Sequence, residues 1–350
     1  MQFAPTDIEI SFFTKTYNSK TAERHAFFSL YWFGYFYQAN KIDINQNNIY
    51  VVLQNFIKFL ESEKTINGSW NRGDKSYQDG EIVKPFSNAT VKAYMGYIRT
   101  YFASKNLKTD DREYRRLVRI KKPYKEIKYT PDLTMVQKMI YGIFPKYQTF
   151  LVCLVATGAR QSEVIKLKVR DISFDKTPAS VHFPAQITKT KTERYSFLTQ
   201  EASEYLKKQI KDKAPDDLVF ADINISTFRY VFHRLRIKVE MEAKYATGTS
   251  KLTPHRLRAY ANRILTREAD PAFADVILGH AKGLQTYDIG NMDQMREDYS
   301  KAEAGLTINA EMRKSSQKAT NDKMQAEIDR LKMEISLIKK ADNFQSTHII

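Results

Sequence analysis

Apolar residues in the first third of the chain recur at steps of three and four, as on one face of an α-helix. Three such runs are Ala26, Phe27, Leu30, Tyr31 and Tyr35; Val52, Phe56, Phe59 and Leu60; and Val91, Tyr94, Tyr97 and Ile98. The stretch Asn67–Gly80 is rich in Gly, Asn, Asp and Ser and predicts a loop. We therefore expect a bundle of about four helices over residues 19–111, with the aromatic side chains as its core and residues 1–18 as an N-terminal extension.

The pattern changes after residue 130 to helices mixed with two short strands. Asp132 is a candidate N-cap, and an apolar helix around Thr149–Thr157 is expected to end at Gly158, before a second helix that starts near Gln161. Val181–Phe183 and Arg194–Leu198 have strand character, with a polar hairpin connection at Thr188–Glu193. Helical periods return at 200–212, 225–244, 255–268 and 271–278. Because strands and helices do not alternate regularly, residues 131–309 predict a mainly α domain with a small antiparallel β-sheet.

The tail, residues 310–350, is polar and highly charged, yet it carries an apolar seam. The spacings between its apolar members are four, three, four and three residues, which is a heptad pattern of about two repeats. The members are Met324, Ile328, Leu331, Ile335 and Ile338. Such a short seam is marginal as an isolated helix. The sequence therefore leaves two alternatives, self-association through 324–338 or packing of the tail on its own domain.

Basic residues are concentrated between the two expected domains, in a linker that we place at 112–130. Eight of the residues at 112–128 are Lys or Arg, against two glutamates, and Pro123 lies within the linker. The segment is either a solvated tether or a strap that contacts DNA phosphates, where each cation would release condensed counterions. We expect the strap. The DNA-binding candidates are Arg115, Arg116, Arg119, Lys121 and Lys122.

The composition supports a nucleic-acid partner. The formal net charge is +16 over 350 residues, which favours binding of polyanions. Cys153 is the only cysteine, so an intrachain disulfide is excluded, and its apolar neighbours indicate a buried residue rather than a metal ligand. No signal peptide is evident, and the most apolar stretch, Phe27–Tyr37, is too short to span a bilayer. We expect a cytoplasmic, DNA-associated protein of the host cell that does not bind membranes.

Three short motifs carry the candidate chemistry. They are Thr157-Gly-Ala-Arg160-Gln-Ser-Glu163, His255-Arg-Leu-Arg258 and Leu278-Gly-His280. Breaking a DNA phosphodiester requires a nucleophile, groups that stabilise the charge on the phosphate oxygens, and an acid for the leaving oxygen. Arginine suits the second task because a guanidinium forms bidentate bonds with phosphate and stays charged.

This ordered set resembles the catalytic signature of the tyrosine recombinases, the phage integrase family. The resemblance covers residues 135–308 closely and 19–128 only in architecture. It implies that Arg160 and Arg258 clamp the scissile phosphate, that His255 handles protons and His280 donates to the phosphate, and that Glu163 braces the site. Alone, His-x-x-Arg and Leu-Gly-His are weak patterns, so the signal lies in the whole ordered set. Ala259 stands where many family members have a second histidine.

Two further residues remain open on the sequence. The family places a lysine, the acid, in a β-hairpin between the first two motifs, where Lys189 and Lys191 both lie, and Lys189 aligns better. The tyrosine nucleophile usually follows the third-motif histidine by about nine residues, but position 289 is Ile. Tyr287 is the first choice and Tyr299 the runner-up.

The resemblance implies a helical core-binding domain at 19–111 and a catalytic domain at 131–309. It also implies a site-specific recombinase that forms a 3′-phosphotyrosyl intermediate with no metal or other cofactor. The partner would be double-stranded DNA, bound as a homotetramer on two duplexes. The hairpin and the closing Leu306-Thr-Ile308 are similar to integrases of archaeal viruses and plasmids, which suggests a mobile element. The alternatives are a type IB topoisomerase and a non-catalytic DNA-binding regulator.

Overall fold

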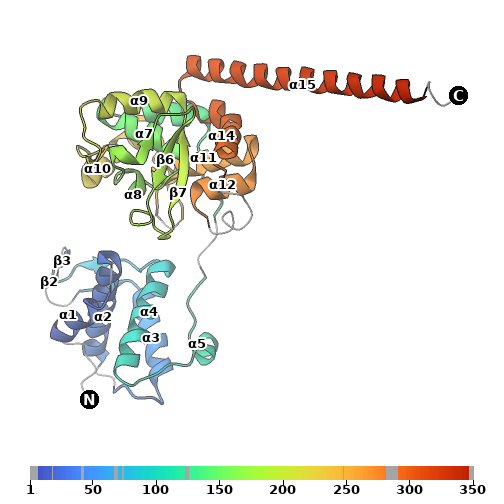
Figure 1. The fold of residues 1–350 in the computed structure, drawn as a ribbon. Coiled ribbons are helices and arrows are strands. Elements are labelled where there is room, and N and C mark those ends of the chain that lie inside the picture. The colour runs from blue at the N-terminus through green and yellow to red at the C-terminus, as the bar shows by residue number, and fades with distance from the viewer. Residues whose placement is uncertain are drawn as a thin grey trace. The chain divides into compact units, whose positions relative to one another are not determined.

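The computed structural model describes residues 7–17, 19–40, 43–66, 70–72, 75–122, 126–246, 248–280 and 291–346. The chain divides into two compact units, Met1–Glu126 and Ile127–Ile350, each with its own hydrophobic core (Figure 1). The boundary falls inside the segment that the sequence marks as a basic linker. No helix in the described part of the chain is both long and apolar enough to cross a membrane.

The first unit is a helical bundle around an aromatic core. Phe33 is fully buried and meets Phe56 and Phe102 edge to face, with ring centroids 5.2 and 5.1 Å apart. This geometry is the favourable one for aromatic pairs, and it confirms that the aromatic runs form a core. The helices are α1 (Asp7–Thr14), α2 (Lys20–Asn40), α3 (Ile49–Glu61), α4 (Asn88–Ser104) and α5 (Asp111–Leu117). Ile10 of α1 is also buried, so the start of the chain belongs to this core.

The prediction of a loop over Asn67–Gly80 is wrong in part. Two strands, β2 (Trp70–Arg72) and β3 (Lys75–Tyr77), form an antiparallel hairpin there. A second pair, β1 (Lys64–Thr65) and β4 (Ile82–Val83), flanks it. The physical reason is tertiary: the Tyr77 ring packs edge-on against buried Trp32, with centroids 5.7 Å apart. A polar stretch with one anchored aromatic residue, Tyr77, can therefore pair as strands.

Part of the basic segment is folded onto the first unit. Asp110 caps α5 by accepting hydrogen bonds from the backbone N–H groups of Arg112 and Glu113. After α5, Val118 is buried in the bundle core. The side chain of Gln54 holds Arg119 by accepting from its backbone N–H at 2.6 Å. Residues up to about 120 thus extend the bundle.

The second unit is mainly helical with one small antiparallel sheet, as the sequence predicts, and the sheet has a third strand, β5 (Ile172–Ser173), that the sequence analysis did not identify. The sheet order is β5, β6 (Ala179–Phe183) and β7 (Arg194–Leu198), and Val181 lies opposite Ser196. The helices are α6 (Leu133–Gly142), α7 (Pro145–Thr157), α8 (Gln161–Val164), the 3-10 turn η1 (Val169–Asp171), α9 (Gln200–Ile210), α10 (Ile225–Lys238), α11 (His255–Glu268), α12 (Pro271–Leu278), α14 (Met292–Leu306) and α15 (Ala310–Ser346). Asp132 caps α6 as expected, accepting from the N–H of Met135.

Helix α7 is the central element of this unit. All its residues from Thr149 to Thr157 are buried, and it packs against α9, α11, α14 and β7. It ends at Gly158, whose φ of +59° is in the left-handed region that favours glycine. A Cβ at this position would lie 2.7 Å from Cδ2 of Leu278. The C-terminal ends of α7 and α12 therefore approach closely, and this juxtaposition brings the first and third motifs together.

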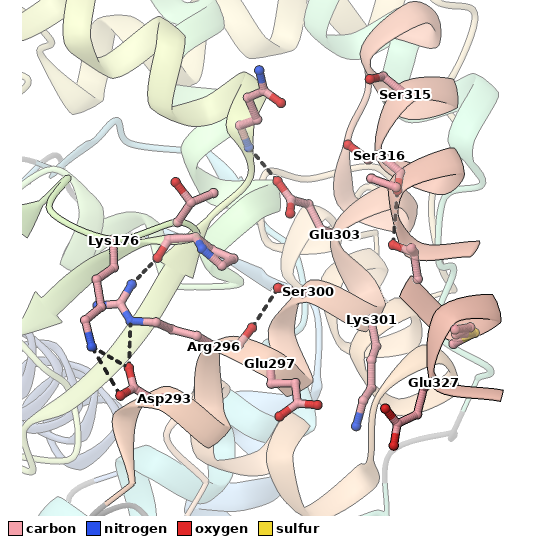
Figure 2. Close-up of a pocket in the computed structure, with 16 residues that line it drawn as sticks. Lys176, Asp293, Arg296, Glu297, Ser300, Lys301, Glu303, Ser315, Ser316 and Glu327 are labelled. Carbon is pink, nitrogen blue, oxygen red and sulfur yellow. Dashed lines mark hydrogen bonds and ion pairs between the residues drawn. The ribbon is translucent and has the colours of Figure 1, made fainter. Parts of the chain in front are cut away.

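The end of α14 is tied to the domain before α15 begins. Glu201 of α9 is buried and accepts from the backbone N–H groups of Ile308 and Asn309 at 2.6 and 3.1 Å. Figure 2 shows the outer face of α14, where Lys176 pairs with Asp293 and Glu303 accepts from the backbone N–H of Gln200. A groove of about 800 Å³ lies between α14 and the first turns of α15. Helix α15 thus starts from a fixed point.

Candidate active site

Arg160 and Glu163 form the base of the site, at the start of the short helix α8. Arg160 is the N-cap residue, and its backbone N–H and Nη1 both donate to the Glu163 carboxylate at 3.0 and 2.9 Å. Glu163 is fully buried, whereas the Arg160 side chain keeps 21% exposure. One nitrogen of the guanidinium is therefore used to hold the side chain. Among the described residues, no acceptor occupies its Nε or Nη2.

Arg194 is a site residue that the sequence analysis missed. It begins β7, and its Nη2 donates to the Glu163 carboxylate at 2.8 Å while its Nε donates to the carbonyl of Ile277 at 3.1 Å. Its guanidinium also lies over the Phe183 ring, 4.1 Å from the centroid. Burial alone would raise the pKa of Glu163, but the charges of Arg194 and Arg160 outweigh burial and lower it. Glu163 is thus an anion that holds two cations.

Arg258 fastens the ends of two helices together. From α11 it donates through Nη1 to the carbonyl of Gly158 at 2.9 Å and through Nη2 to that of Leu278 at 2.6 Å. The residue is buried, and burial together with the nearby charges of Arg160 and Arg194 lowers its pKa to about 10. It still carries its charge at neutral pH. The second motif therefore lies beside the first and third.

Asp275 orients His280, and it is the second residue that the sequence analysis missed. The Nδ1 atom of His280 lies 2.7 Å from Oδ1 of Asp275, and its Nε2 lies 3.1 Å from Nη2 of Arg258. A guanidinium only donates, so Nε2 is the acceptor and Nδ1 carries the proton that Asp275 accepts. The five-residue spacing across the end of α12 is a signal that could have identified Asp275, but only once the helix end was known.

His255 and Lys189 lie at the exposed edge of the site. The backbone N–H of Lys189 donates weakly to Glu163, at 3.4 Å. Partial burial of the imidazole, followed by the charges of Arg258, Arg256, Arg160 and Lys189, lowers the pKa of His255. His255 is therefore mainly neutral at pH 7, because its usual pKa is already below 7. Lys191 is exposed in the same hairpin and has a left-handed φ of +59°.

Only one of the two candidate nucleophiles, Tyr299, lies among the described residues. Tyr287 lies outside the described residues. Tyr299 is fully buried within α14, and its hydroxyl donates to the carbonyl of Ala156 at 2.9 Å. Burial, with the charge of Glu303 as a smaller contribution, raises the pKa of Tyr299 well above its usual value. Tyr299 is a core residue in this conformation.

The residues predicted to contact DNA phosphates lie on the first unit. Arg115, Arg116, Arg119, Lys121 and Lys122 are all exposed there. Arg116 approaches Glu113 at 3.8 Å and Lys121 approaches Glu61 at 3.5 Å, which are weak surface pairs. In the part of the chain that is described, no group of three or more His, Cys, Asp or Glu residues could hold a metal ion.

The arrangement is suited to binding a phosphodiester. Three guanidiniums gather around a single buried carboxylate, and the charge of Lys189 acts on nearby His255, so the local charge is strongly positive. Because Glu163 fixes Arg160 and Asp275 fixes the His280 ring, these side chains require little reorganisation when a phosphate enters. The residues of the cluster lie on α8, the β6–β7 hairpin, α11 and α12. The fold therefore brings together residues that are far apart in sequence.

Comparison with known proteins gives consistent matches. Residues 135–289 match the model of the phage integrase family. Tyrosine recombinase XerA of Saccharolobus solfataricus is 30% identical over 182 residues, which cover 51% of this chain and 57% of XerA. Tyrosine recombinase XerC of Staphylococcus aureus is 25% identical over 267 residues, or 71% of this chain and 86% of XerC.

The fold is also found among solved structures. The XerH site-specific recombinase bound to difH substrate in a pre-cleavage complex superposes with a TM-score of 0.54 and 16% identity over 84% of each chain. At this identity the similarity concerns the fold. The alignment with XerA spans little more than half of that protein's length.

Proposed function

We propose that this chain, which matches the model of the phage integrase family over residues 135–289, is a tyrosine recombinase that cuts and rejoins DNA strands through a 3′-phosphotyrosyl intermediate. The observation that carries this proposal is a cluster of basic groups. Arg160 and the Lys189 backbone N–H donate to buried Glu163, and Arg258 contacts His280 beside them. The charge and the donors of this cluster match the oxygens of one phosphodiester.

Each side chain has a role in the proposed step. The hydroxyl oxygen of Tyr287 attacks the scissile phosphorus and forms the phosphotyrosyl bond, while the bond to the 5′ oxygen breaks. Arg160 and Arg258 stabilise the charge on the non-bridging oxygens. To donate to the phosphate as well, His280 must carry a proton on both ring nitrogens. Lys189 protonates the leaving 5′ oxygen, and His255, whose lowered pKa keeps it neutral, accepts the tyrosine proton. The phosphotyrosyl bond conserves the bond energy, so a 5′-hydroxyl of a second strand can reverse the step.

Tyr287 is preferred over Tyr299 as the nucleophile. A buried tyrosine with a raised pKa, held by a backbone carbonyl, is poorly placed to attack a phosphate. Tyr287 follows His280 by seven residues, so a short turn can return it to the phosphate that His280 contacts. Glu163, Arg194 and Asp275 act through the groups they position.

The substrate in this proposal is double-stranded DNA at a specific site, bound by four copies on two duplexes, within the host cell. Integration or excision of a mobile element is the biological role that the family resemblance suggests. The exposed cations Arg115, Arg116, Lys121 and Lys122 would contact DNA phosphates. Neutralising all four should then reduce the slope of log affinity against log salt by about 3 to 4, since each phosphate contact contributes about 0.9. An unchanged slope removes these contacts from the proposal.

The decisive experiment traps the covalent intermediate. Protein–DNA complexes formed on genomic DNA of the source organism are denatured, digested and sequenced to locate the target site. A nicked duplex of that site then accumulates the adduct, and peptide mapping identifies the attached residue. We expect Tyr287 on a 3′-phosphate, with undiminished adduct in excess chelator. Absence of any adduct would leave a DNA-binding regulator. Relaxation of supercoiled DNA without strand exchange between two duplexes would indicate a topoisomerase.

A further inference from the structure

The outer part of α15 exposes an apolar stripe that its own domain does not cover. Every residue from 324 to 336 is exposed. Three large apolar side chains on one face, Ile328, Leu331 and Ile335, keep 46 to 52% of their surface accessible. Met324 borders the groove along α14 but is itself 55% exposed. A regular stripe of this kind on a mainly polar helix is typical of an unpaired interaction surface.

The residue types in the stripe favour one kind of partner. With Ile328 and Ile335 at the a positions, Met324 and Leu331 take the d positions of the heptad. β-Branched residues at a with Leu at d favour two-stranded parallel coiled coils. Asn321 takes the preceding a position and is exposed. A single Asn at a specifies register and the number of strands at some cost in stability.

The charges beside the stripe determine the orientation. Glu327 and Glu334 take the g positions, Lys332 takes an e position, and the sequence places Lys339 at the next e position. In a parallel pair each g residue faces the following e residue of the partner helix, five positions further on. Both such contacts would be Glu with Lys. In an antiparallel pair g faces g and e faces e, so glutamates would face glutamates and lysines would face lysines.

Contacts within the helix leave these glutamates available. Arg330 approaches Glu327 at 3.9 Å and Glu334 at 3.1 Å, and all three side chains are more than half exposed. Exposed pairs of this kind contribute about 0–1 kcal/mol and exchange readily. The glutamates can therefore turn to a partner helix at little cost.

We propose that residues 321–338 of α15 pair with the same residues of a second copy of this chain as a parallel, in-register, two-stranded coiled coil. The seam spans only about two and a half heptads, so the pairing is weak in free solution. It becomes populated when two copies are held near each other, because the second contact is then intramolecular with an effective concentration on the order of millimolar. This last point rests on the proposed binding of several copies to one DNA site, whereas the pairing itself does not.

Disulfide trapping in the full-length chain tests the register. In a parallel coil the two copies of a d residue lie against each other, so Met324→Cys should cross-link between copies under mild oxidation. Met333→Cys is the matched control, since Met333 is 68% exposed at the f position on the opposite face. Native Cys153 is buried and stays in both variants. We expect cross-linking of Met324→Cys to be at least tenfold faster than that of Met333→Cys.

The alternatives give different results. In an antiparallel pair centred near Leu331, the two copies of residue 324 would be about 20 Å apart, from fourteen residues at 1.5 Å each. A dimer without the disulfide would therefore overturn the parallel arrangement. Equal rates for the two variants, or no cross-linking in either, would overturn the pairing. Binding of the wild-type chain to anionic vesicles through the stripe, without cross-linking, would assign it to a membrane surface.

Charge reversal provides an independent test with its own rescue. Glu327→Lys with Glu334→Lys places lysines at both g and e, and Lys332→Glu with Lys339→Glu places glutamates at both. Each double variant alone should associate at least tenfold more weakly than wild type by sedimentation equilibrium. An equimolar mixture should recover the wild-type affinity. If both variants associate like wild type, or if the mixture shows no recovery, the interhelical contacts are refuted, whether or not the chain cleaves DNA.

Discussion

Glu163 and Glu334 both pair with arginine, but they represent two opposite regions of the molecule. The side chains of Glu163 and its partner Arg194 are 0 and 3% exposed, whereas those of Glu334 and Arg330 are 51 and 69% exposed. The two distances, 2.8 and 3.1 Å, are similar. Burial therefore decides what each pair does. A buried pair that loses one partner leaves an uncompensated charge, whereas a surface pair exchanges freely with water.

This difference separates a fixed site from an adaptable surface. Around Glu163, several elements converge on one carboxylate, so the geometry is set before any substrate arrives. Along α15, the charged side chains are exposed and can exchange one ion-pair partner for another. In our proposals, the same residue types thus serve catalysis in one region and recognition between copies in the other.

The largest expected effect separates the buried tyrosine, Tyr299, from the proposed nucleophile, Tyr287. Tyr287→Phe should abolish the covalent adduct, because it removes the attacking oxygen. Tyr299→Phe should leave the adduct and lower the free energy of unfolding by about 1 kcal/mol, through loss of the hydrogen bond to Ala156. Adduct formation on a suicide substrate and denaturant unfolding measure the two effects. Retained adduct in Tyr287→Phe would make Tyr299 the candidate, and recovered cleavage on mixing Tyr287→Phe with Arg160→Ala would show a tyrosine acting in trans.

Arg160 tests the fixed site through a side chain that is partly accessible. Arg160→Ala should reduce single-turnover cleavage by about 10²–10³-fold, because the arginine stabilises charge that develops in the transition state. DNA binding should change little. The control is Arg170→Ala, which removes an exposed arginine paired with Asp216 at 2.7 Å in the same unit. Wild-type cleavage by Arg160→Ala would contradict the assignment.

Substitution of Glu163 tests how much the buried ion pair with Arg194 contributes to the free energy of unfolding. Glu163→Gln should lower the free energy of unfolding by about 3–5 kcal/mol, because Arg194 would stay buried without a counter-charge. The folded-state pKa of Glu163 is lowered, so its contribution is full above the unfolded value of about 4.3 and is lost as pH falls through the folded pKa. The difference between wild type and variant in denaturant unfolding should therefore shrink below about pH 4. A difference that persists unchanged at lower pH would contradict the ionised pair.

Substitution of Asp275 should reduce the cleavage rate less, because Asp275 acts only through His280. Asp275→Ala removes the acceptor that sets the ring orientation and tautomer, and we expect cleavage to slow by about tenfold, the equivalent of one charge-assisted hydrogen bond. Asp275→Asn should retain most activity, because its side-chain oxygen can still accept from Nδ1. Equal losses in both variants would indicate that the carboxylate charge, not orientation, is required.

Substitution of Arg330 should have the smallest effect on stability, because its ion pairs are exposed. Arg330→Ala removes two exposed contacts within α15 and should change the free energy of unfolding by no more than about 0.5 kcal/mol. Thermal unfolding of the full chain measures this effect. A loss approaching that of Glu163→Gln would show that α15 is an integral part of the folded domain.

Several local features could be predicted because short-range chemistry determines them. Asp132 begins a helix because its carboxylate accepts an otherwise unpaired N–H, and Gly158 ends one because it adopts a positive φ. The hairpin strands were visible from their β-prone residues. The strand pair at β2 and β3 was not, because Tyr77 becomes part of a strand only through its contact with Trp32.

The amino-acid sequence by itself determined most helix positions and two of the three strands of the second unit, the order of the three motifs and the heptad stripe of α15. Only the tertiary structure showed that Arg194 contacts Glu163, that Asp275 contacts His280 and that Tyr299 is buried in the core, since a side chain's partner far away in sequence leaves no local trace. Arg194 meets Glu163 across 31 residues, and Tyr299 meets Ala156 across 143. Capping and turn residues near in sequence determine where a helix begins. Burial and long-range packing determine which charged side chains are fixed in one ion pair and which can change partners.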